Sequence, residues 1–178
     1  MAVDRLVHHE LRAVLSVFAA LAVALTALGL VRGFSAPDRP GALAGYFGAL
    51  LALLVLWTLL KATRIKWFSH VRDFEKAVPV EDLDVVLPAD RFLRDQPISP
   101  GLFGMYLVLA LPLSFWEPWT LGVLLWSALD WLGQAALVAH WERRNGLLLW
   151  RGHVGGRPWE LSVSRRPPTR TATGARPA

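Results

Sequence analysis

Residues 119–141 read WTLGVLLWSALDWLGQAALVAHW, and this stretch decides the fold class. Asp130 is the only residue in it that carries a full charge at neutral pH. A helix needs about 20 mainly apolar residues to cross the hydrocarbon core of a bilayer. The stretch therefore predicts a transmembrane helix, which ends where the charged run Glu142, Arg143 and Arg144 begins.

Three further apolar blocks precede it, at residues 13–31, 42–60 and 101–116. The first block is longer than the 7 to 15 residues of a signal-peptide core, so we interpret it as a retained helix rather than a signal peptide. The third block reaches only about 24 Å at about 1.5 Å per residue, which leaves a re-entrant loop as the alternative. We predict an all-α integral membrane protein with four transmembrane helices in two hairpins.

The composition agrees with this class. Hydrophobic residues make up 54% of the 178 residues and charged residues 19%, against about 25% charged residues in ordinary globular domains. The absence of cysteine excludes disulfides, thiolate metal sites and a cysteine nucleophile. Arginine greatly outnumbers lysine, which suggests a GC-rich bacterial coding sequence.

Lysine and arginine counts predict the orientation, because positive residues stay on the cytoplasmic side of short loops. Two of them precede the first block, two lie between the first and second, and seven lie between the second and third. None lies between the third and fourth, and eight follow the fourth. Four crossings with both termini cytoplasmic place 17 of the 19 inside. We therefore expect a multi-pass protein of the cell membrane.

The predicted organisation has six parts. They are a cytoplasmic N-terminus (1–12), a first transmembrane hairpin (13–60), a cytoplasmic loop (61–100), a second transmembrane hairpin (101–141), a cytoplasmic β-hairpin (142–164) and a disordered basic tail (165–178). The loop begins with an amphipathic helix that either lies on the inner leaflet or packs against protein. It continues to a short strand around Val86. The β-hairpin turns at Gly152, Gly155 and Gly156, and needs the loop or a partner to pack on.

Asp130 is the strongest functional candidate, because a carboxylate inside a bilayer is costly and marks a functional site by default. Ser127 and Gln134 share its helix face, and equal depth on the preceding helix places Tyr106 beside it. His140 follows near the inner end as a proton exit. No basic residue is expected at the depth of Asp130. We favour a packing or partner-docking role for this carboxylate over a proton- or cation-binding role.

Small residues recur every four positions in the first two blocks. Such spacing lets two helix backbones approach closely. We expect these residues to pack the first helix on the second, or to mediate self-association. The positions are Ser16, Ala20, Ala24, Gly41, Gly45 and Gly48.

No phosphate loop, nucleophile elbow, catalytic carboxylate pair or zinc pattern is present. The sequence therefore predicts no cofactor and no metal, and it favours a protein that is not an enzyme. The expected partners are the lipid bilayer and another membrane protein or a second copy of the chain, with no specific nucleic acid. The predicted function is an accessory or scaffold subunit of a membrane complex. The alternative is a small proton- or cation-coupled carrier that uses Asp130.

Overall fold

The computed structural model describes residues 4–33, 40–63, 70–79, 93, 96–151 and 161–165. It is mostly helical, with three long apolar helices, a shorter apolar one and a small sheet. The helices are α1 (Leu6–Arg32), α2 (Pro40–Ala62), α3 (His70–Glu75), α5 (Pro100–Trp116), η1 (Pro118–Thr120) and α6 (Leu121–Asn145). The strands are β1 (Asp4–Arg5), β2 (Val78–Pro79), β3 (Leu147–Arg151) and β4 (Leu161–Arg165). The glycine turn at 152–156, the predicted strand around residue 86 and the tail from residue 166 lie outside the described residues.

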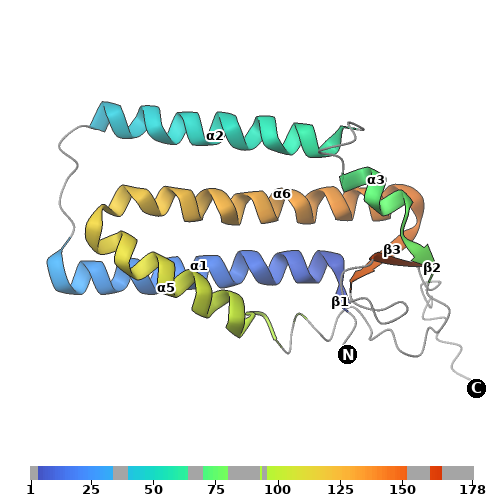
Figure 1. Cartoon of the computed structure of the whole chain (residues 1–178), viewed down its shortest axis with the longest axis horizontal. Coiled ribbons are helices and arrows are strands. Elements are labelled where there is room, and N and C mark those ends of the chain that lie inside the picture. The colour runs from blue at the N-terminus through green and yellow to red at the C-terminus, as the bar shows by residue number, and fades with distance from the viewer. Residues whose placement is uncertain are drawn as a thin grey trace, which may run out of the picture.

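The long helices lie side by side with α6 between α1 and α2, and α5 crosses α1 (Figure 1). This arrangement corrects the expectation that the first helix packs on the second. Instead, α1 packs on α5 and α6, while α2 packs on α6. The physical reason lies in α1, where Ala20 and Ala24 are fully buried and allow two neighbouring helices to approach the same helix closely.

Helix α5 crosses α1 obliquely but runs in the same general direction (Figure 1). At its beginning the Ser99 N–H donates to Ser16 Oγ at 2.9 Å, and at its end Arg32 Nη1 donates to the Phe115 carbonyl at 2.5 Å. Sixteen positions separate Ser16 from Arg32, and sixteen separate Ser99 from Phe115. The two chain segments therefore advance along the bundle by equal amounts, so that α5 keeps level with α1. The structure contains no reversal of direction within this helix.

Two apolar clusters hold the bundle together. The larger one lies where α1, α5 and α6 meet, and it consists of Val17, Ala20, Leu21, Ala24, Tyr106, Ala110, Leu121, Leu124 and Ala128. The smaller one lies at the sheet end of the bundle and consists of Leu6, Phe74, Val138 and Leu149. Phe74 belongs to α3 and also contacts the Trp141 ring edge-on, with centroids 5.8 Å apart. The buried face of α3 therefore packs against protein.

The sheet has the strand order β1-β3-β4-β2. Helix α6 ends at Gly146, which has a φ of +66° and lets the chain turn directly into β3. Strands β3 and β4 form the predicted antiparallel hairpin. Strand β1 pairs antiparallel with β3, and β2 pairs parallel with β4. The pairing brings residues 4–5 and 161–165 to the same end of the bundle (Figure 1).

Candidate functional site

Asp130 forms a buried ion pair with Lys61. The Lys61 ammonium lies 2.7 Å from each of the two carboxylate oxygens, and the side chains are only 6% and 19% exposed respectively. The ammonium also lies 5.4 Å from the centroid of the Trp57 ring, in cation–π geometry. The expectation that no basic residue reaches the depth of Asp130 was therefore wrong.

The register of α2 against α6 explains how the pair forms. Phe47 lies opposite Gly122 and Thr58 lies opposite Gly133, so the two helices run parallel with matching residues eleven apart on each. By this register the Lys61 backbone lies six residues, or about 9 Å, beyond that of Asp130. Side chains on a helix lean toward its N-terminus. The long Lys61 side chain accordingly extends back along α2 and into the bundle.

Glu10 adds a second buried carboxyl at this end of the bundle. It lies on α1 with an exposure of 3%, and its Oε2 has no hydrogen-bond partner among the described residues. Lys61, Asp130 and Arg151 are close enough to act on it electrostatically. We call Glu10, Lys61 and Asp130 the inner charge cluster. Three separate helices contribute one residue each to it.

His70 of α3 borders the same cluster. Burial lowers the pKa of its imidazole below the usual 6.5, and the positive charge of Lys61 lowers it further. The carboxylates of Asp73 and Asp130 act in the opposite direction, with a smaller effect. The histidine is therefore held neutral at the pH where a free histidine would begin to take up a proton.

The other residues predicted around Asp130 are only partly brought together. Tyr106 and Ser127 form a hydrogen bond with each other, with their oxygens 2.8 Å apart, and Asp130 is not part of it. Gln134 is half-buried and His140 is exposed. Within the described residues, neither forms a hydrogen bond with Asp130.

The small residues divide into two groups. Ser16, Ala20 and Ala24 are completely buried, and they face α5 and α6. The glycines of α2 face open space, since a Cβ added at Gly41, Gly45 or Gly48 would meet nothing within 4 Å.

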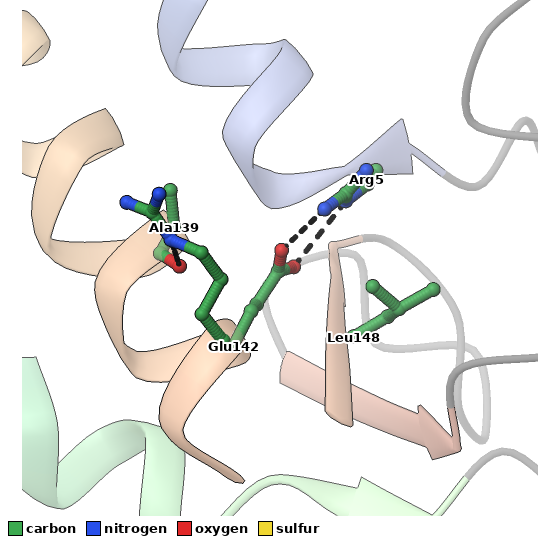
Figure 2. Close-up of a pocket in the computed structure, with 5 residues that line it drawn as sticks. Arg5, Ala139, Glu142 and Leu148 are labelled. Carbon is green, nitrogen blue, oxygen red and sulfur yellow. Dashed lines mark hydrogen bonds and ion pairs between the residues drawn. The ribbon is translucent and has the colours of Figure 1, made fainter. Parts of the chain in front are cut away.

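A second buried ion pair fastens the sheet to α6 (Figure 2). Arg5 Nη2 donates to Glu142 Oε2 at 2.5 Å, while Oε1 of the same carboxylate accepts the Leu149 N–H at 2.9 Å. One carboxylate on α6 thus holds a residue of β1 and the backbone of β3. The contact borders a cavity of about 240 Å³, whose remaining walls come from Ala139, Arg143 and Leu148.

Sequence reasoning missed Glu10 and the partner of Asp130. Glu10 and Lys61 both lie just outside the uninterrupted apolar blocks, so the sequence pattern places both side chains in water. The sequence did contain one indication of Lys61, namely the carboxylate of Asp130, because a buried charge requires a partner. Lys61 is the basic residue in the last turn of α2, and its side chain extends back to Asp130.

The chain matches no family model, no curated protein and no solved structure. Across the described residues, no group of three or more histidines, aspartates or glutamates is arranged to hold a metal ion. The chemical character of the site therefore rests on two carboxyls and one ammonium. These groups can bind protons, and they can hold helices together.

Proposed function

We propose that this chain is a bacterial cell-membrane protein with four crossings and cytoplasmic termini, and that it serves as an accessory or scaffold subunit of a membrane complex. Three long helices are apolar enough to cross a membrane, and α5 keeps level with α1. Sheet pairing brings the first and last described strands to one end, as an even number of crossings requires. The distribution of arginine and lysine supports the cytoplasmic side for that end.

The observation that carries the subunit role is the isolation of α2. This helix has a mean hydropathy of 2.2 over its most apolar window, yet none of that window is buried within the chain. Its main packing partner is α6, with a smaller contact to α3, and large apolar side chains such as Leu51, Leu56 and Leu59 are 55–60% exposed. Asp130, in turn, is neutralised within the chain and anchors α2 to α6. A helix held on one side is suited to receive another membrane protein on the other.

Purification of the tagged chain in mild detergent tests this role. A stoichiometric membrane partner should copurify with the wild type, and Leu56→Trp on α2 should release it. Val108→Trp is the matched control, because Val108 is 71% exposed on α5, and this variant should retain the partner. Recovery of the chain alone or as a homo-oligomer would contradict the proposal.

Single cysteines test the orientation, because the natural chain contains none. A cysteine at Thr173 should react with an impermeant maleimide only after the cells are permeabilised. A cysteine at Glu117, on the exposed turn between α5 and α6, should react in intact cells. The reverse pattern would refute cytoplasmic termini.

A proton- or cation-coupled carrier is the second candidate, and the observation that favours it is the presence of two carboxyls around a single lysine in the inner charge cluster. Asp130→Asn distinguishes the two functions. Loss of function with expression and complex formation intact would favour a carrier. Retained function in Asp130→Asn, together with failed assembly in Asp130→Leu, would favour the subunit role.

A further inference from the structure

The inner charge cluster holds two acidic groups and one lysine that can form ion pairs with them. An ammonium has three N–H donors, and Lys61 directs its shortest contacts to the two oxygens of Asp130, at 2.7 Å each. Asp130 is therefore neutralised within the chain. Among the described residues Glu10 has no such contact, and Arg151 and Lys61 act on it only electrostatically, without a hydrogen bond.

Glu10 is buried, and one oxygen of its carboxyl lacks a hydrogen-bond partner among the described residues. Glu10 is 3% exposed, and its buried Oε2 has no hydrogen-bond donor among the described residues. A buried ionised carboxylate without hydrogen bonds is so unfavourable that such groups take up a proton instead. An uncharged carboxylic acid removes this penalty.

Charged groups on three other elements act electrostatically on Glu10. Lys61 lies on α2, Asp130 on α6 and Arg151 on β3, while α5 carries no charged residue. On α1 itself, the neighbouring titratable groups are His8, His9 and Arg12. Among the described residues, none of the cationic groups forms a hydrogen bond with the Glu10 carboxyl.

We propose that Glu10 is a reversible proton-binding site, in which the carboxyl holds a proton while Lys61 remains paired with Asp130. Glu10 takes the proton from water at the sheet end of the bundle, forming one O–H bond and breaking one in the donor. The protonated cluster then carries no net charge. Loss of the proton leaves a second carboxylate that attracts Lys61 as well as Arg151, which couples proton binding to the contact between α2 and α6.

Infrared spectroscopy of the full chain in lipid nanodiscs tests the proposal. At about pH 6 exposed carboxyls are ionised, because their pKa values lie near 4, so a protonated-carboxyl C=O band reports only perturbed groups. We expect one such band at that pH, lost reversibly as the pH is raised. It should shift when glutamate is labelled with ¹³C and stay in place when aspartate is labelled.

Variants then assign the band. Glu10→Gln should abolish it, while Glu142→Gln and the exposed control Glu75→Gln should retain it. If Glu10→Gln does not fold, a glutamate-labelled band retained in a folded protein that combines Glu81→Gln, Glu142→Gln and Glu160→Gln decides in favour of Glu10, since the two other glutamates, Glu75 and Glu117, are exposed. Absence of the band at pH 6, a shift on aspartate labelling, or a band that persists in folded Glu10→Gln would overturn the proposal.

Discussion

Replacing Lys61 by methionine removes the positive partner of Asp130 and keeps the length of the side chain. Breaking a buried ion pair by removing one partner costs about 3–5 kcal/mol, because an uncompensated charge remains. Asp130 is 19% exposed, so we take the lower end, about 3 kcal/mol. That value corresponds to more than a hundredfold change in the unfolding equilibrium constant, since about 1.4 kcal/mol is a factor of ten.

The opposite single variant, Asp130→Leu, should cost less. Lys61 lies in the last turn of α2, and a lysine without a partner can swing its flexible stem toward the headgroups and return its charge to water. Asp130 lies in the middle of α6, and its short side chain cannot carry the carboxylate to water. We therefore expect about 1–2 kcal/mol for Asp130→Leu.

The double variant Lys61→Met/Asp130→Leu completes the cycle. Replacing a buried pair by apolar residues is often neutral or stabilising, so we expect its stability to return to within about 1 kcal/mol of wild type. Unfolding of the purified protein in mixed micelles, followed by tryptophan fluorescence, measures all four species. Two single variants that each lose less than about 0.5 kcal/mol, or losses that simply add in the double variant, would refute a buried ion pair here.

Three further predictions concern other parts of the fold. Gly122→Ala should destabilise the α2–α6 contact by about 1–2 kcal/mol, because the new Cβ would lie 2.9 and 3.0 Å from two aromatic side chains of α2; the control Gly48→Ala, in open space, should not destabilise the protein in the same unfolding assay. Glu142→Ala should cost about 3 kcal/mol and accelerate amide exchange in β3, whereas unchanged exchange would show that Arg5 and the β3 backbone do not depend on this carboxylate. Relative to His70→Gln, the wild type should lose stability as the pH falls through 6.5, because the pKa of His70 is lowered in the folded state and the unfolded chain binds the proton first; since proton uptake by Glu10 acts in both proteins, a stability difference that does not change with pH would contradict this reasoning.

The sequence was sufficient to predict the four apolar helices and the β-hairpin, because both follow from local patterns. Apolar blocks of about 20 residues between charges define membrane helices, and two strand-forming runs around glycines define a hairpin. Local patterns do not determine which helices pack against each other. Small residues on α1 predicted a close neighbour, but the same spacing fits any partner, and the chosen partner, α2, was wrong.

The candidate site shows the same division. The position of Asp130 within an apolar block predicts that burying its carboxylate is unfavourable. An oppositely charged partner is therefore expected. Finding Lys61 needed the register between α2 and α6, which no local pattern contains. A sequence position gives the depth of a residue's backbone in the bundle, but not the depth of its charge. A lysine side chain can place its charge about 6 Å from its own Cα.

The sheet joins segments that are far apart in the chain, with β1 and β2 flanking a hairpin made of β3 and β4. During translation, the residues of β1 emerge first and the hairpin that binds them emerges last. In the proposed membrane topology, the helices therefore enter the bilayer while both flanking strands still lack their partners. In that topology closure of the sheet follows synthesis of β3 and β4, and a ribosome that stops after residue 145 would release a helical bundle whose sheet cannot form.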